Sequence, residues 1–134
     1  MQTSLTFDTE PILALFFDEP GANFVADLLQ KIQINDLQGY INVINLAEVY
    51  YSIARKDLKA AEEKQNILRA FGLKIVPIDD NGLWREAALI KTKYGLSLGD
   101  CFAVATAQAY KSKLVVGSDK ELNNLKIPLI KIRK

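Results

Sequence analysis

The chain has 134 residues, a length that fits one domain, and its 49% hydrophobic and 25% charged residues are typical of a globular protein rather than a disordered one. Its formal net charge of +1 neither indicates nor forbids a nucleic-acid partner. There is no histidine and only one cysteine, Cys101, which excludes imidazole-based catalytic triads, histidine-ligated zinc sites, cysteine-cluster metal sites and an internal disulfide.

Short apolar runs that favour strands alternate with longer segments of helical periodicity. In chain order we expect a strand at 4–7, helices at 11–17 and 22–32, a strand at 40–44, helices at 46–54 and 58–71, a strand at 74–78, helices at 83–94 and 99–110, and strands at 114–116 and 128–132. The strands are apolar without alternation, which predicts an α/β fold whose parallel sheet is covered by helices on both faces. No repeat or linker interrupts the pattern, so we expect a single domain over 1–134.

Other features exclude further classes of protein. The glycine spacing contains neither the Gly-x-Gly-x-x-Gly loop of dinucleotide-binding domains nor a P-loop. The apolar run at 12–17 is far shorter than the ~20 residues needed to cross a bilayer, and the first residues lack the basic stretch of a signal peptide. We therefore expect a cytoplasmic protein with no membrane partner.

Acidic side chains follow the predicted strands. Asp8 ends the first strand, and Asn45 and Glu48 open the helix after the second. Asp100 opens the apolar helix at 99–110, and Asp119 follows the fourth strand. Because the carboxyl ends of parallel strands share one rim, we expect these carboxylates to gather there.

Each of these residues also has a purely structural interpretation. Three segments fit a capping box, namely Asn45-x-x-Glu48, Ser97-x-x-Asp100 and Ser118-x-x-Glu121. Asp79 and Asp80, before Asn81-Gly82, fit a turn. Cys101 fits a small buried apolar residue. Asp8 has no obvious helix to cap and would be costly to bury unpaired, so its structural interpretation is the weakest.

Clustered carboxylates raise each other's pKa unless a positive charge lies among them. Mg²⁺ and Mn²⁺ prefer oxygen ligands and supply that charge. A metal held in this way lowers the pKa of a bound water and directs it at phosphorus, which is chemistry that needs no histidine.

Several segments resemble the PIN domain, and in particular the short PIN proteins that act as toxins of VapBC-type toxin–antitoxin pairs. They are Phe7-Asp8-Thr9, Asn45-Leu-Ala-Glu48-Val, Leu-Ser-Leu-Gly-Asp100 and Ser118-Asp119-Lys-Glu121-Leu, and together they cover the chain in the expected order. The resemblance implies a three-layer α/β/α fold with a central five-stranded parallel sheet. It also implies an endoribonuclease dependent on Mg²⁺ or Mn²⁺, an antitoxin partner and a homodimer.

The same resemblance implies the roles of the site residues. Asp8, Glu48, Asp100 and Asp119 would hold the metal and carry catalysis, and the residues in support would be Thr9, Asn45, Ser118 and Glu121. Two positions depart from the family pattern: Glu10 stands where a small residue is usual, and Gly117 stands where serine or threonine is common.

Charge is unevenly distributed along the chain. Residues 1–50 carry seven acidic side chains against Lys31 alone, whereas residues 111–134 carry seven basic side chains against Asp119 and Glu121. The basic segment fits either a phosphate-binding surface beside the acidic site or a solvated final strand.

Competing hypotheses belong to other functional classes. A PIN-like protein-binding module without nuclease activity would use the acids only as helix caps. A haloacid-dehalogenase-type phosphatase needs Asp-x-Asp after the first strand, which Asp8-Thr9-Glu10 does not supply. A phosphoreceiver domain needs an acidic pair after the first strand and a single aspartate after the third strand, the reverse of the pattern in this chain.

Three aromatic residues, Tyr50, Tyr51 and Trp84, are expected to be exposed and to mark a contact surface.

Overall fold

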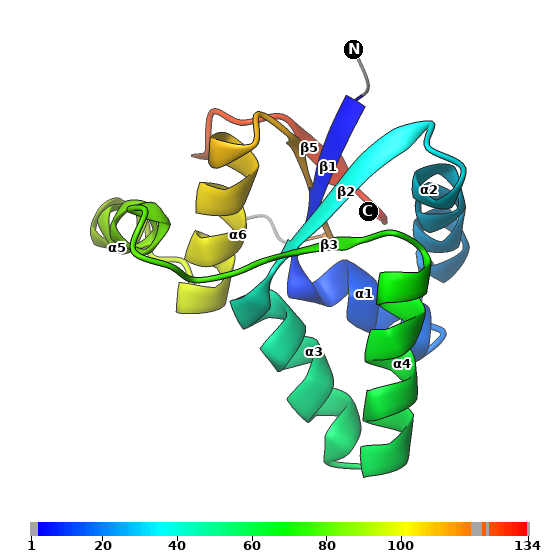
Figure 1. Ribbon diagram of the computed structural model, residues 1–134. Coiled ribbons are helices and arrows are strands. Elements are labelled where there is room, and N and C mark those ends of the chain that lie inside the picture. The colour runs from blue at the N-terminus through cyan, green and yellow to red at the C-terminus, as the bar shows by residue number, and fades with distance from the viewer. Residues whose placement is uncertain (1–2, 119–121, 123, 134) are drawn as a thin grey trace.

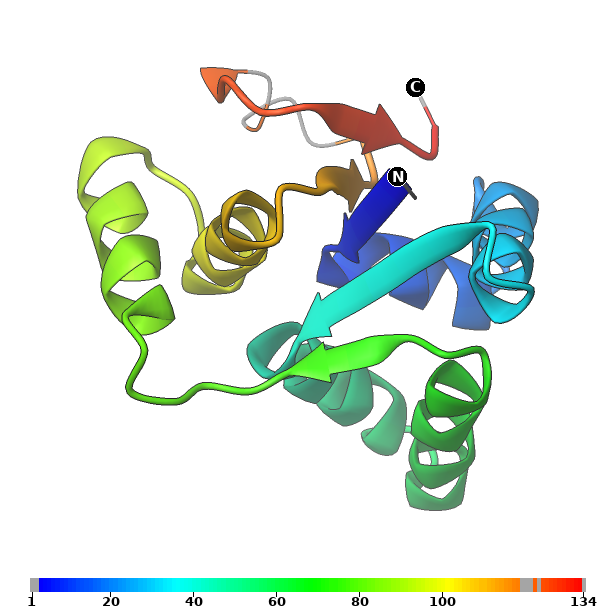
Figure 2. The same ribbon diagram turned by 45° about the horizontal axis from the view of Figure 1, so that its top comes forward.

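The computed structural model describes residues 3–118, 122 and 124–133 (Figure 1). Five parallel strands form one sheet in the order β3-β2-β1-β4-β5. The strands are β1 Thr3–Phe7, β2 Leu37–Asn42, β3 Lys74–Val76, β4 Lys113–Val116 and β5 Leu129–Lys131. Figure 2 shows them side by side, with β1 at the centre. The predicted five-stranded parallel sheet is therefore confirmed.

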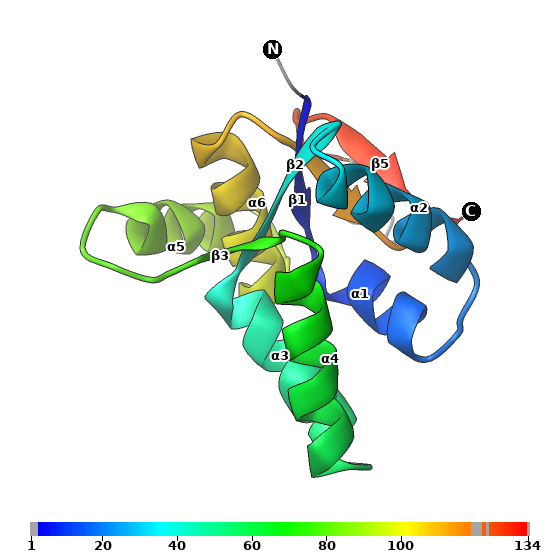
Figure 3. The same cartoon turned by 45° about the vertical axis from the view of Figure 1, so that its right-hand side comes forward.

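Six helices cover the two faces of this sheet. They are α1 Thr9–Phe16, α2 Ala22–Gln33, α3 Val43–Ala54, α4 Leu58–Ala70, α5 Leu83–Lys93 and α6 Leu98–Ala109. α5 and α6 lie on one side and α1 to α4 on the other, as Figure 3 shows. The three-layer α/β/α arrangement predicted for the chain is the arrangement found.

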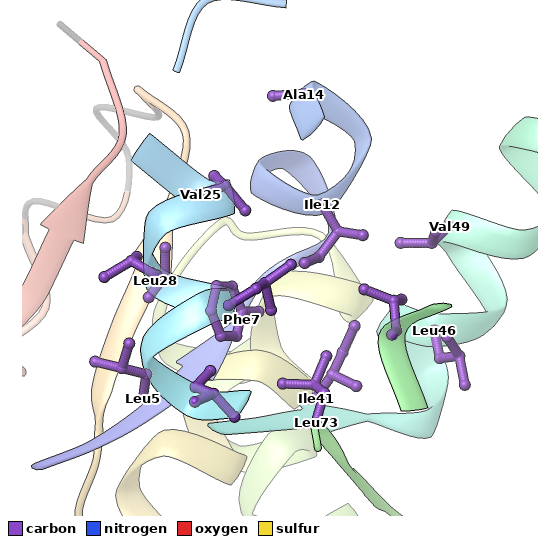
Figure 4. Packing of buried hydrophobic residues seen from close by; sticks show 14 of the residues in the cluster. Leu5, Phe7, Ile12, Ala14, Val25, Leu28, Ile41, Leu46, Val49 and Leu73 are labelled. Atoms are coloured by element: carbon purple, nitrogen blue, oxygen red, sulfur yellow. The ribbon is translucent and has the colours of Figure 1, made fainter. Parts of the chain in front are cut away.

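The core consists of one apolar cluster on each face of the sheet. Consecutive residues of β4 alternate between the two clusters, with Val115 on the α1–α4 side and Leu114 and Val116 on the α5–α6 side. Phe7 and Ile12 are fully buried at the centre of the larger cluster (Figure 4). Burial on both faces explains why apolar residues of β4 follow one another without alternating with polar ones.

Two strands differ from the predicted bounds by two residues or more, and the other three differ by one. The strand expected at 40–44 occupies Leu37–Asn42, because Asn42 caps α3 and its Oδ1 accepts a hydrogen bond from the backbone N–H of Ile44 at 2.8 Å. The strand expected at 74–78 ends at Val76, since Pro77 has no N–H to continue the ladder.

Within residues 3–118, 122 and 124–133, no helix combines the length and apolar character that crossing a bilayer requires.

Candidate active site at the carboxyl rim of the sheet

Asp8 follows β1 directly and caps α1. Its Oδ1 accepts a hydrogen bond from the backbone N–H of Thr9 at 2.9 Å, and only 4% of the residue is exposed. The expectation that Asp8 has no helix to cap is therefore wrong: α1 begins at Thr9, two residues before the predicted start, and Pro11 is tolerated in its first turn. Capping and burial together hold the Asp8 carboxyl group at the end of the central strand.

Glu48 and Asp100 reach the same rim from α3 and α6. The Thr9 hydroxyl donates to Glu48 Oε1 at 2.7 Å. A Cβ placed on Gly99 would lie 2.3 Å from Glu48 Oε1, so the Glu48 carboxylate packs directly against the first turn of α6. Asp100 lies in that turn, and its backbone N–H donates to the capping Ser97 Oγ at 3.2 Å. The capping role predicted for Ser97 is confirmed.

Asn45 joins these segments with its buried side-chain amide. Nδ2 lies 3.1 Å from both Thr9 Oγ1 and the Gly99 carbonyl oxygen, and 3.4 Å from the carboxylates of Asp8 and Glu48. The capping box proposed for Asn45 and Glu48 is wrong, because α3 begins at Val43, three residues before the predicted start, and Asn42 supplies its cap. Asn45 Oδ1 is buried and, within the described part of the chain, has no hydrogen-bond partner.

Four of these residues, Asp8, Thr9, Glu48 and Asp100, line one hollow of about 380 Å³. Its polar lining residues are Asp8, Thr9, Glu10, Glu19, Glu48, Ser52, Ser97 and Asp100. Figure 1 shows why they converge: the first turns of α1, α3 and α6 all begin near the carboxyl end of β1. The structure thus brings together Asp8, Glu48 and Asp100 with Thr9 and Asn45.

The remaining predicted site residues follow β4. Ser118 is half-buried and comes two residues after Val116, the last residue of the strand next to β1. Asp119 and Glu121 lie outside the described residues, and so does the proposed capping box at 118–121.

The two positions that depart from the family pattern, Glu10 and Gly117, are in contact in the structure. A Cβ on Gly117 would lie 2.2 Å from the Glu10 carboxyl carbon, so the Glu10 carboxylate occupies the room that a side chain at 117 would take. Glu10 also forms an ion pair with Arg133, whose Nη1 donates to the Pro20 carbonyl oxygen at 2.9 Å. Sequence reasoning missed Arg133, because its partner is 123 positions away.

Two lysines of the basic C-terminal segment lie away from the acids. Lys113 begins β4 and Lys111 precedes it, which places both lysines at the amino rim of the sheet, opposite the acidic hollow. Arg133, after β5, is the basic residue that contacts the rim of the hollow through Glu10. Among the described residues, the proposed phosphate-binding surface beside the site therefore does not include these two lysines.

The electrostatics of the hollow are dominated by crowded carboxylates. Burial raises the pKa of Asp8 well above its ordinary value, and the nearby charge of Asp100, a hydrogen bond to the Asp100 carboxyl and the charge of Glu48 raise it further. The backbone N–H of Thr9 lowers this pKa, but by less. Asp8 is therefore expected to keep its proton at pH values where an isolated aspartate has lost its own.

The donor set fits a hard divalent cation. No group of three acidic or cysteine side chains in the described part of the chain is already arranged around a metal position. However, the donors that face the hollow include carboxylate oxygens, which Mg²⁺ and Mn²⁺ prefer, and the pKa of the buried Asp8 carboxyl is raised among them. A bound cation would neutralise the charge of these carboxylates in place of the proton on Asp8. Asp8, Glu48 and Asp100 are the described residues that would hold it.

Other residues singled out in the sequence have structural roles. Asp79 Oδ1 accepts from the Asn81 N–H at 3.2 Å in an exposed turn, as predicted. Cys101 is fully buried, and burial raises the pKa of its thiol. Tyr51 and Trp84 are exposed as expected, whereas Tyr50 is half-buried and donates its hydroxyl to Glu62 at 2.7 Å.

The sequence matches the model of the PIN domain family over residues 5–128. A search of curated protein sequences found no significant match. Among solved structures, the chain is similar to a toxin–antitoxin complex from Klebsiella pneumoniae, with 18% identity, a TM-score of 0.76 and coverage of 97% of this chain and 98% of that chain.

Two further structures show the same fold. VapBC2 from Rickettsia felis, bound to a DNA fragment from their promoter, has 18% identity and a TM-score of 0.75, and the match covers 96% of this chain and 98% of that chain. DNA-bound VapBC from Salmonella typhimurium has 17% identity and a TM-score of 0.68, with coverage of 98% and 99%. The family match runs from β1 to the residue before β5 and contains every acidic residue of the predicted site, and the chain therefore belongs to the PIN domain family.

Proposed function

We propose that this protein is an endoribonuclease that depends on Mg²⁺ or Mn²⁺. The observation that carries the proposal is the convergence of Asp8, Glu48 and Asp100 on one hollow, where burial and mutual repulsion raise the pKa of Asp8. Such a carboxylate group is costly to fold without a compensating cation. Asp119, which follows β4 in sequence, is the proposed fourth acid.

The bound cation would supply a water of lowered pKa and would neutralise charge that develops on the phosphate. The chain's own residues orient the ligands. Thr9 holds Glu48 through its hydroxyl, and the Asn45 amide keeps Asp8, Glu48 and the first turn of α6 together. Because no histidine is available to move a proton from the ribose 2′-hydroxyl, we expect direct attack by water and a 5′-phosphate product.

We further propose that the protein is the toxin of a type II toxin–antitoxin pair. The support is the similarity in fold to the toxin–antitoxin complexes described above. The expected partners are an RNA substrate, an antitoxin and a second copy of the chain.

The test is cleavage of single-stranded RNA by the purified protein with Mg²⁺ or Mn²⁺, with mass spectrometry of the product ends. Asp8→Asn and Asp100→Asn should abolish cleavage, whereas Asp79→Asn, in the exposed turn outside the hollow, should leave it near normal. Cleavage in EDTA, or products that end in 2′,3′-cyclic phosphate, would contradict the mechanism. A wild-type protein that cleaves no RNA would favour a protein-binding module.

Growth on expression tests the toxin role separately. Wild type should arrest growth, and co-expression of the neighbouring antitoxin gene should relieve the arrest. If wild type and Asp8→Asn affect growth equally, the toxin role is wrong.

A further inference from the structure

The acidic hollow extends away from the carboxylates between α1 and α3, which lie side by side. Its outer lining includes Phe17, which follows α1, and Ser52 of α3. Glu48 and Ser52 are one helical turn apart, and Lys56 follows one turn later, just past the end of the helix. The Lys56 ammonium lies 4.7 Å from the centre of the Phe17 ring. At the end of the hollow away from Asp8, the lining therefore includes the aromatic ring of Phe17, and the Lys56 ammonium lies over that ring.

Lys56 is one of two basic residues in the short loop between α3 and α4, where Asp57 follows it. Arg55, next to Lys56, lies 4.9 Å from the centre of the Tyr51 ring. Among the described residues the single ion pair joins Arg133 to Glu10, so no described carboxylate forms an ion pair with Lys56 or Arg55. Both side chains belong to exposed residues. The loop between α3 and α4 thus presents two cations, each beside an aromatic ring.

This combination suits single-stranded nucleic acid. Phosphates are attracted to lysine and arginine, and unpaired bases stack on aromatic rings irrespective of sequence. Because Lys56 is exposed, its ammonium can move from the ring to a phosphate while the ring receives a base. We propose that Lys56 and Phe17 position the nucleotide next to the scissile phosphate, with the phosphate on Lys56 and the base on Phe17. This inference rests on the proposed ribonuclease function.

Steady-state cleavage of a short oligouridine tests the proposal. Lys56→Ala and Phe17→Leu should each raise KM about tenfold and leave kcat unchanged, because both residues bind RNA outside the metal site. Lys56→Ala should also lower the slope of log KM against log salt concentration by about one, whereas Phe17→Leu should not change the slope. Lys56→Arg should retain wild-type KM. Leucine is chosen at 17 because Phe17 also packs against the core.

Lys113→Ala is the matched control, because Lys113 is also exposed but lies at the opposite rim of the sheet. Fluorescence anisotropy with the same RNA, in an Asp100→Asn background, measures binding independently of cleavage. If RNA binding depends on Lys56 but the wild type cleaves no RNA, the proposed ribonuclease function is wrong and the proposed RNA-binding site at Lys56 and Phe17 is supported. Cleavage with KM unchanged in Lys56→Ala and Phe17→Leu would overturn the site alone, even if these variants weakened binding of an antitoxin.

Discussion

Asp8 links the stability of the protein to pH. Its pKa is raised in the folded state, so the folded protein binds this proton more tightly than the unfolded chain does. The free energy of unfolding of the metal-free protein should therefore fall as the pH rises from the ordinary range of aspartate through the raised pKa of Asp8. A divalent cation should restore the loss at neutral pH.

Asp8→Asn removes this titration and keeps an oxygen that can cap α1. We expect the variant in EDTA to melt at or above the temperature of wild type at neutral pH, and the advantage to vanish below about pH 4, where unfolded aspartate is protonated. Mg²⁺ should raise the melting temperature of wild type but not that of the variant. A variant that melts many degrees below wild type at neutral pH would mean that Asp8 has a structural role instead.

Gly99 is the second residue on which the site depends, because a Cβ there would lie 2.3 Å from Glu48 Oε1. Gly99→Ala should displace the Glu48 carboxylate and weaken Mn²⁺ binding by about tenfold or more, as calorimetry would measure. The helix itself should not suffer, since alanine in a helix is favoured over glycine by about 0.5–1 kcal/mol. Gly95→Ala, with no atom within 4 Å of the added Cβ, is the control. Equal Mn²⁺ affinity in the two variants would show that metal binding does not depend on the position that the Glu48 carboxylate takes beside Gly99.

At the scale of helices and strands, the side chain of Arg133 connects the segment after β5 to α1. Arg133 lies two residues after β5 and contacts both Glu10 of α1 and the Pro20 carbonyl oxygen before α2. Because both partners of the ion pair are partly exposed, we expect Arg133→Ala to lower the free energy of unfolding by only about 1 kcal/mol.

A double-mutant cycle in urea isolates this contact. Glu10→Gln should cost less than Arg133→Ala, because Arg133 also donates to the Pro20 carbonyl oxygen, and the double variant should cost little more than Arg133→Ala alone. Lys131→Ala, exposed in β5, should be near neutral. Additive losses would show that Glu10 and Arg133 stabilise the protein independently.

The helices and strands were predictable from sequence because hydrophobic periodicity and caps are local. Asp8, Glu48 and Asp100 could be placed on one rim because the ends of parallel strands coincide. The start of α3 was misplaced because either Asn42 or Asn45 can cap a helix, and only the sheet register and the bond from Asn42 Nδ2 to Thr106 fix the choice. The contact of Gly117 with Glu10 could not be predicted, since it depends on how β4 and α1 approach each other.

At the scale of the whole molecule, apolar side chains remain on the surface. Trp84 and Leu89 of α5 are 42% and 49% exposed, and Tyr51 of α3 is 48% exposed. Such surface usually marks association. We expect light scattering to report a dimer of the isolated chain at micromolar concentration. A monomer under these conditions would contradict the proposed homodimer.

The two outer strands of the sheet bear on how any such assembly can form. β3 and β5 have three residues each, proline follows one and precedes the other, and each carries an exposed lysine, Lys74 or Lys131. Short, charged, proline-flanked margins are poor templates for adding a strand from a neighbouring chain. We therefore expect subunits and other protein partners to meet this molecule through its helices rather than through an added strand, and the same residues disfavour fibrous aggregation.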